Sequence, residues 1–253
     1  MPVLFRKTPP AFVALVVLAG LLGAPGSDAD AAGERVLRKK VIGKSVEGRP
    51  VVTWRQGSAR PDFRVLVVGS IHGDERQGMR VTARLRQILA SRHGPKGVAF
   101  WTVRTANPDG TRAGSRRNAR RVDLNRNFPY RWDGSLNGGY NSGPRPASEP
   151  ETRAVMKLNR KLRFDLAIWY HQPWGRTLAP CNRDRRWAFL YARLSGLRSG
   201  RCDRGYYPGS ATSWQRHSSG TTAFVVEFAA GTRPRPEIRR HARAVIRLAR
   251  RMG

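Results

Sequence analysis

Residues 64–75 read RVLVVGSIHGDE, and this stretch decides the fold class. Its apolar run, VLVV, has the composition of a strand that is buried on both faces of a sheet. A histidine and a carboxylate, His72 and Glu75, come directly after this strand. Because functional groups gather where the strands of an α/β sheet end, the stretch predicts a site at this turn.

The flanking sequence alternates between strand and helix patterns. Strand composition recurs at residues 98–103, 165–170 and 220–228, and two β-type runs within residues 36–54 predict a starting hairpin. Helical periodicity covers residues 77–92, 150–162, 186–197 and 236–252. This alternation predicts a single α/β domain with three layers.

Residues 105–150 form a long stretch without a clear period. From Trp132 onward it is rich in Gly, Asn, Ser and Pro, which is the composition of a loop. A loop of this length in a compact domain usually either carries function or has been wrongly assigned as a loop. At its end, Ser148 to Glu151 has the pattern of a capping box and predicts that a helix begins there.

The charge of the chain is strongly unbalanced. Its 253 residues include 48 Lys or Arg and 17 Asp or Glu, which gives a net charge of +31. One interpretation is an acidic partner, such as nucleic acid, anionic lipid or an anionic cell-wall polymer. The other is an arginine-rich surface that merely faces water. The basic residues are scattered and do not alternate with stacking aromatics, which favours the second interpretation and argues against a specific nucleic acid.

Residues 1–31 have the features of a secretory signal. The pair Arg6-Lys7 precedes an apolar run over residues 11–22, and Ala29-Asp30-Ala31 matches a cleavage site. The apolar run is shorter than a membrane span requires, and no cysteine follows it for lipid attachment. We therefore expect residues 32–253 to be a mature catalytic domain that is secreted to the extracellular or cell-wall space, without a transmembrane span.

The only two cysteines are Cys181 and Cys202. Two are too few for a disulfide scaffold or a cysteine-based zinc module. Neither lies in a motif typical of a catalytic thiol. Because export leads to an oxidising compartment, we expect the pair to form a disulfide.

Two of the five histidines end apolar strands: His72 follows VLVVGSI, and His171 follows LAIWY. With Glu75 they offer a His, Glu, His ligand set whose fourth position is left to water, and this is the pattern of a catalytic zinc site. Taken alone, each histidine is also compatible with an ordinary hydrogen-bonded residue. The H-x-x-E spacing alone does not decide between the two.

Further motifs follow in a fixed order. They are ANPDG at 106–110, R-x-N-A at 116–119, VDLNRNFP at 122–129, SEPET at 148–152, YPGSATSW at 207–214 and VVEF at 225–228. Together with HGDE and WYHQP, this ordered set resembles the zinc carboxypeptidase family of the carboxypeptidase A type. The resemblance runs from about Ser45 to Gly231. It implies a mixed, twisted sheet with helices on both faces.

The resemblance also implies roles at the reacting centre. His72, Glu75 and His171 match the ligands of one zinc ion. Glu227 matches the catalytic carboxylate, and Arg116 matches the arginine that polarises the scissile carbonyl and stabilises the oxyanion.

Substrate-binding roles follow in the same way. Asn125 and Arg126 match the pair that binds the carboxylate of the substrate, a task that suits the planar arginine fork. Tyr207 matches a mobile tyrosine, with Tyr206 as the alternative because the spacing to Trp214 is short. Thr212 matches the base of the side-chain pocket and is neither apolar nor acidic.

The implied function is zinc-dependent hydrolysis of an amide next to a free carboxylate, by a secreted monomer. One expected substrate is the γ-D-glutamyl–diaminopimelate bond of peptidoglycan stem peptides. An alternative is a secreted metallocarboxypeptidase for ordinary peptides. A third, from another class, is a non-catalytic basic module on the same fold that binds cell wall or nucleic acid.

Overall fold

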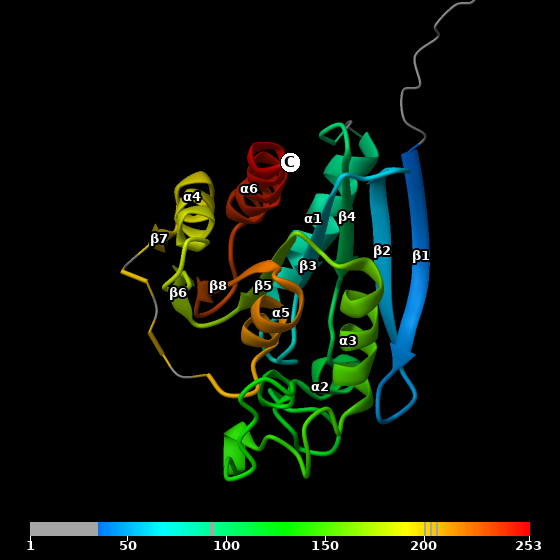
Figure 1. The fold of residues 1–253 in the computed structure, drawn as a ribbon, viewed down its shortest axis with the longest axis vertical. Helices are drawn as coiled ribbons and strands as arrows, with labels where there is room; N and C mark the ends of the chain where they lie inside the picture. The colour runs from blue at the N-terminus through cyan, green and yellow to red at the C-terminus, as the bar shows by residue number, and fades with distance from the viewer. Residues whose placement is uncertain (1–34, 92–93, 200, 203, 206) are drawn as a thin grey trace, which may run out of the picture. The chain divides into compact units, whose positions relative to one another are not determined.

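An eight-stranded sheet organises the protein, with the strand order β1-β2-β4-β3-β5-β8-β6-β7 (Figure 1). The computed structural model describes residues 35–91, 94–199, 201–202, 204–205 and 207–253. The predicted signal over residues 1–31 therefore lies outside the described residues. Within the described ranges, no helix has the length and apolar character needed to cross a membrane.

The centre of the sheet is parallel and its flanks are mostly antiparallel. The strands are β1 Arg35–Lys44, β2 Pro50–Ser58, β3 Phe63–Val68, β4 Val98–Val103, β5 Leu166–His171, β6 Trp174–Leu178, β7 Arg198–Ser199 and β8 Thr222–Ala229. β3 pairs in parallel with β4 and β5, and β5 with β8. All residues of β4 and β5 are buried, as expected for strands covered on both faces. β1 and the two-residue β7 form the edges.

Helices cover both faces of the sheet (Figure 1). They are α1 Gln77–Ser91, α2 Pro108–Ala113, α3 Pro150–Leu162, α4 Arg185–Ser195, α5 Ala211–Ser219 and α6 Arg235–Met252, with short 3-10 turns η1 Leu124–Arg126 and η2 Gly138–Tyr140. α1, α4 and α6 share one apolar core with the sheet, and α3 and α5 share the other. The predicted three-layer α/β fold with a mixed sheet is confirmed.

Four short elements were not predicted from the sequence: α2, α5, β6 and β7. α2 lies inside the stretch assigned to loop. The side chain of Asn107 accepts a hydrogen bond from Gly110 N at its start, Pro108 is its first residue, and Gly114 ends it in the left-handed region (φ 65°). Six residues are too few to show an apolar period, so only these terminal signals mark the helix.

The capping box predicted at Ser148 is wrong. The N-cap of α3 is Glu149, and its side chain makes no capping hydrogen bond. The hydroxyl of Ser148 instead donates to Glu149 Oε1 (2.7 Å) and accepts from Asn127 Nδ2 (2.9 Å). The Ser148 hydroxyl is therefore engaged by Asn127 and Glu149 and does not cap α3.

Cys181 and Cys202 form the expected disulfide. Cys181 follows β6, and Cys202 precedes α5, so the bond closes a loop that contains α4 and β7. The two cysteines are 21 residues apart in sequence. In the chain-entropy model a loop of this size stabilises the folded state by about 3 kcal/mol, because the crosslink restricts the unfolded chain.

We predict that the double substitution Cys181→Ser/Cys202→Ser lowers the free energy of unfolding by about 3 kcal/mol. Urea denaturation of oxidised wild type and the variant measures the difference. Wild type treated with a reductant is the control and should unfold like the variant. Equal stability of all three samples would contradict the prediction.

Candidate active site

The carboxyl ends of neighbouring parallel strands bring the predicted residues together. His72 and Glu75 lie in the turn between β3 and α1, and His171 is the last residue of β5. β3 and β5 are paired in parallel. Glu227 of β8 lies directly opposite His171 in the sheet register. Residues that are far apart in sequence therefore meet at the carboxyl ends of the central strands, where sites of α/β sheets are usually found.

The turn that carries His72 and Glu75 is fixed by a close backbone contact. Gly73 packs on Gly110 of α2, and a Cβ atom at Gly73 would lie 1.9 Å from the Gly110 carbonyl carbon. No side chain larger than hydrogen fits there without moving the backbone. The HGDE and NPDG motifs are therefore two halves of one contact, which sets the position of the turn beneath the site.

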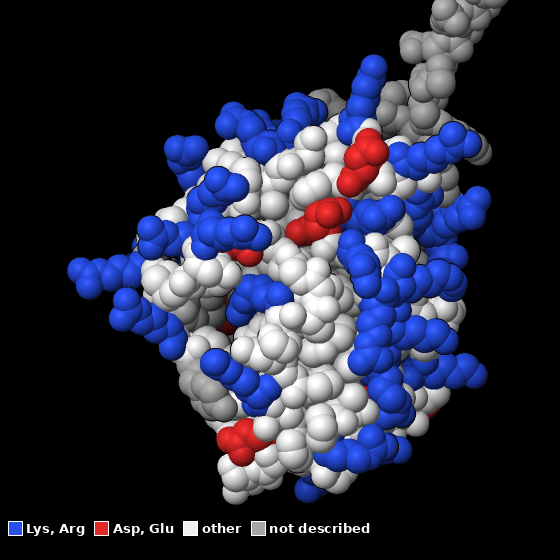
Figure 2. Space-filling view, in the orientation of Figure 1, with Lys and Arg blue, Asp and Glu red and all other residues white. Residues whose placement is uncertain are grey.

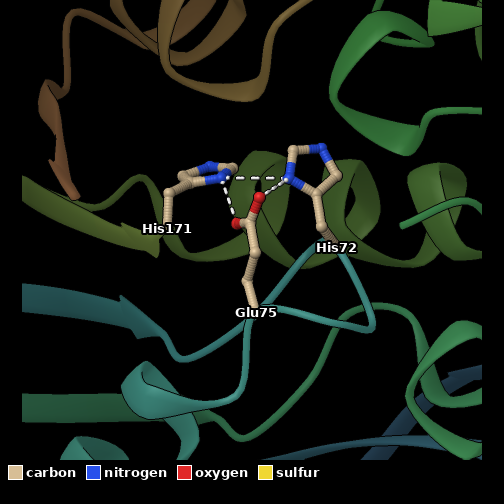
Figure 3. Close-up of side chains that lie close together, drawn as sticks. All are labelled: His72, Glu75 and His171. Carbon is tan, nitrogen blue, oxygen red and sulfur yellow. Dashed lines mark hydrogen bonds and ion pairs between the residues drawn. The ribbon is translucent and has the colours of Figure 1, made fainter. Parts of the chain in front are cut away.

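Three buried side chains point toward one centre (Figure 3). The Nδ1 atoms of His72 and His171 are 3.1 Å apart, and each lies 2.8 Å from an oxygen of Glu75. Zinc binds histidine nitrogen at about 2.0–2.1 Å, so two nitrogens of a tetrahedral site lie about 3.3 Å apart. The spacing and the donor set of two imidazoles and one carboxylate fit zinc.

A fourth buried side chain, Asp123, contacts His72 on the side that faces away from the cluster. Its Oδ1 atom lies 2.9 Å from His72 Nε2, the ring nitrogen that faces away from the cluster. Its Oδ2 atom accepts hydrogen bonds from Arg116 Nε (3.1 Å) and Nη2 (2.8 Å). Burial alone would raise the pKa of Asp123, but the charges of His72 and Arg116 hold that pKa well below its usual value. Asp123 is therefore placed to orient His72, a candidate metal ligand.

Glu227 faces the cluster but is not part of it. It lines the same cavity, and its Oε2 atom is buried without a hydrogen-bond partner among the described residues. Burial, and then the negative charge of Glu75, raise the pKa of Glu227 to about 7. A carboxylate in this state is suited to accept and return a proton near neutral pH.

Two arginines line the cavity beside the cluster. Arg116 Nη1 donates to Glu75 Oε1 at 3.3 Å, so its guanidinium reaches the edge of the ligand set. Arg126 Nη1 donates to the backbone oxygen of Asn125. Asn125 in turn accepts from Ala211 N at the start of α5 through its side-chain oxygen. The segment that carries the two substrate-binding candidates is thus fastened to the neighbouring helix.

The aromatic ring of Tyr140 lies against both arginines. The guanidinium carbons of Arg116 and Arg126 lie 5.3 Å and 5.4 Å from the ring centre. Tyr140 lines the cavity and is 55% exposed, so its ring lies at the cavity mouth. Cation–π contacts of this kind stabilise two like charges that lie close together.

All of the predicted catalytic, substrate-binding and metal residues line one cavity of about 330 Å³. The ring centre of Tyr207 is 5.8 Å from the guanidinium carbon of Arg126, and Thr212 is buried in the first turn of α5. Tyr206, the alternative to Tyr207, lies outside the described residues. Cys181 and Cys202 are not among the residues that line this cavity.

Two residues of the site, Asp123 and Tyr140, were not predicted from the sequence. Asp123 lies inside the quoted VDLNRNFP motif, where an acid between two apolar residues was a usable signal. Tyr140 lies in a Gly- and Asn-rich loop, and no local pattern marks it. Its role depends on how that loop folds back, with Asn141 O accepting from Asp123 N at 2.7 Å.

Comparison with protein families gives one match over most of the site. A family model described as zinc carboxypeptidase matches residues 29–199. This range contains His72, Glu75 and His171, whereas Glu227 lies beyond it.

Curated relatives and solved structures are similar to this chain. Murein peptide amidase A of Escherichia coli strain K12 is 32% identical over 147 residues, which cover 52% of this chain and 57% of the amidase. Carboxypeptidase SOL1 of Arabidopsis thaliana is 30% identical over 152 residues, 54% of this chain and 29% of that protein. The match therefore spans little more than half of the amidase and less of the carboxypeptidase.

Two crystal structures show the same fold over most of the chain. The murein-tripeptide amidase MpaA of Escherichia coli O157 has a TM-score of 0.64 at 24% identity and covers 84% of this chain and 91% of its own. Carboxypeptidase A of Helicoverpa armigera has a TM-score of 0.72 at 17% identity, over 86% of this chain and 69% of its own.

We predict that Asp123→Asn weakens zinc binding about 10–100-fold, because an amide no longer holds His72 in one orientation and tautomer. Zinc affinity measured by competition with a chelator tests this. His171→Ala removes a proposed ligand and should lose most of the metal, which sets the lower reference. Unchanged zinc affinity in folded Asp123→Asn protein would show that Asp123 does not support the site.

Proposed function

The chain belongs to the zinc carboxypeptidase family, a family of zinc-dependent hydrolases, and we propose that it hydrolyses an amide bond next to a free carboxylate. The observation that carries this proposal is the set of side chains around one cavity. Three of them form a zinc-ligand set, one is a carboxylate with a raised pKa, and two are arginines.

We propose that His72, Glu75 and His171 hold one zinc ion. When bound, zinc acts as a Lewis acid that polarises the scissile carbonyl and lowers the pKa of water to about 7. Asp123 orients His72 for this task through its Nε2 atom.

Two residues of the chain act on the reacting amide. Glu227 accepts a proton from the attacking water and returns it to the leaving amine, for which its buried and unpaired Oε2 atom is placed. Arg116 directs its guanidinium at the oxygen on which negative charge develops. Its two hydrogen bonds to Asp123 fix the guanidinium before substrate arrives, so little reorganisation accompanies the reaction.

Specificity for a terminal carboxylate comes from Asn125 and Arg126. The planar guanidinium of Arg126 forms two parallel hydrogen bonds with a carboxylate. Tyr207, which lies against Arg126, covers the bound end of the substrate. Thr212 contacts the side chain of the residue that carries this carboxylate, since it is buried at the cavity wall.

For the substrate, we propose the γ-D-glutamyl–diaminopimelate bond of peptidoglycan stem peptides. The 32% identity to murein peptide amidase A supports this choice. The similarity to carboxypeptidase SOL1 keeps ordinary peptides as the second candidate. Both substrates present a free carboxylate beside the scissile amide, so they use the same Arg126 contact.

We further propose that residues 1–31 direct export and that residues 32–253 act as a monomer in the extracellular or cell-wall space. The support is the basic, apolar and A-x-A pattern of the first residues, together with the Cys181–Cys202 disulfide, which an oxidising compartment favours.

A substrate panel tests the proposed function. We expect zinc-loaded protein to cleave muropeptides that contain the γ-D-glutamyl–diaminopimelate bond, with products identified by mass spectrometry. Amidation of the free carboxylate should abolish most of the rate, and Arg126→Ala should raise KM for the free acid while changing the amidated substrate little. Cleavage of C-terminally varied ordinary peptides alone would select the second candidate. No cleavage of any amide, with tight binding to cell walls, would favour a non-catalytic module.

We predict that Glu227→Gln lowers kcat by at least about 10²-fold, because the amide keeps the shape of Glu227 but accepts no proton. Zinc content should stay at the wild-type level, since Glu227 is not a ligand. Wild-type activity should fall as the pH drops through the pKa of Glu227, which is about 7 without metal and lower beside a bound cation. Full activity in folded, zinc-loaded Glu227→Gln protein would refute the mechanism.

A further inference from the structure

Helix α6 carries a row of arginines on the side that does not face the core. It contains seven Arg and one Glu in 18 residues. Arg235, Arg239, Arg243 and Arg247 recur every four residues, so they lie along one face, about 6 Å apart along the axis. The opposite side of the helix, which includes Val245 and Leu248, is buried against the sheet.

Helix α1 packs beside α6 and adds a second row. Arg80 and Arg84 are one helical turn apart, and both line a groove of about 990 Å³ together with the α6 arginines. Seven of the twelve residues that line this groove are Arg, and none is Asp or Glu. Lys and Arg make up 48 of the 253 residues of the chain, so the groove is about three times richer in positive charge than the sequence as a whole.

Three arginines of this groove have no acidic partner in the part of the chain that the structure describes. Within the described ranges, Arg84, Arg239 and Arg247 form no ion pair with a carboxylate. Figure 2 shows a related imbalance on the face turned to the viewer, where basic side chains cover far more of the surface than acidic ones. Arginines without acidic partners are ready to bind anions through paired hydrogen bonds.

The shape and lining of the groove narrow the class of anion. Membrane insertion needs an exposed apolar helix face, and that of α6 is buried in the core. Single-stranded nucleic acid is bound largely by stacking its bases on aromatic rings, and none of the described residues that line the groove is aromatic. Duplex DNA is commonly read by a helix that projects into its major groove, whereas α6 is packed against both α1 and α4.

We propose that the α1–α6 arginine groove binds a flexible, single-chain phosphate polymer that carries no bases, such as a polyol phosphate. Successive phosphates would contact arginines of the two rows through bidentate hydrogen bonds. The groove shares no lining residue with the catalytic cavity. The proposal therefore does not depend on the proposed enzymatic function.

Binding of fluorescently labelled inorganic polyphosphate to the full chain tests the proposal, measured by anisotropy over a series of salt concentrations. The test variant is Arg84→Gln/Arg239→Gln/Arg247→Gln, in which Gln preserves helix propensity. The matched control is Lys157→Gln/Arg160→Gln/Lys161→Gln, which removes the same charge from exposed positions of α3 on the other face of the sheet.

We expect the groove variant to bind polyphosphate at least about tenfold more weakly than wild type at low salt. The slope of log K against log salt should decrease in magnitude by about 2, since each lost single-strand phosphate contact contributes about 0.7. The α3 control should stay close to wild type. A poly(glycerol phosphate) competitor should displace the probe, whereas duplex DNA, oligo(dT) and anionic lipid vesicles should compete poorly.

Equal weakening in both variants would show that only the net charge matters and would overturn the proposal. Stronger competition by duplex DNA, oligo(dT) or vesicles than by poly(glycerol phosphate) would also overturn it, in favour of a nucleic-acid or lipid surface. Circular dichroism checks that both variants are folded. Cleavage of a soluble peptide substrate should be equal in wild type and both variants.

Discussion

The buried carboxylate of Asp123 is the constraint on which the rest of the site depends. It contacts a proposed zinc ligand, His72, and the proposed oxyanion-stabilising residue, Arg116. It also accepts from Asn125 N, and thereby begins the short turn that carries Arg126. The groups proposed for metal binding, charge stabilisation and substrate positioning are therefore all positioned by Asp123. Its full burial keeps water from competing for these hydrogen bonds.

The core of the fold could be predicted from the sequence because local and tertiary preferences agree there. β4 matches its predicted bounds, since VAFWTV is rich in strand-forming side chains and is buried throughout. α5 was missed because its Ser, Thr and His residues are poor helix formers. It is stabilised by tertiary contacts instead, such as Trp214 packing on Phe128 with ring centres 5.5 Å apart. Such contacts join residues that are far apart in the sequence, so a short stretch of sequence does not reveal them.

The candidate site, too, could be predicted from the sequence only in part. His72, Glu75 and His171 could be selected because two strands end beside them and because the ordered motifs around them resemble those of the zinc carboxypeptidase family. Asp123 was passed over although its motif marked it, and Tyr140 could not be selected, because its position depends on the path of residues 105–150. That path is fixed by long-range hydrogen bonds such as Asn118 Nδ2 to Glu149 Oε2 (2.8 Å) and by the Gly73–Gly110 contact. Tyr140 reaches the arginines only because this stretch folds back over the cavity.

The two edges of the sheet have a consequence for how copies of the protein meet. A bare edge strand offers unpaired backbone groups that can template intermolecular β-pairing, the first step toward aggregation. β7 is only two residues long, which is too short to recruit another chain. β1 is ten residues long and carries the exposed apolar side chains of Leu37 and Val41, but Lys39 and Lys40 lie between them. A second copy aligned on β1 would bring like charges together, so the basic residues of this strand disfavour edge-to-edge pairing of two copies.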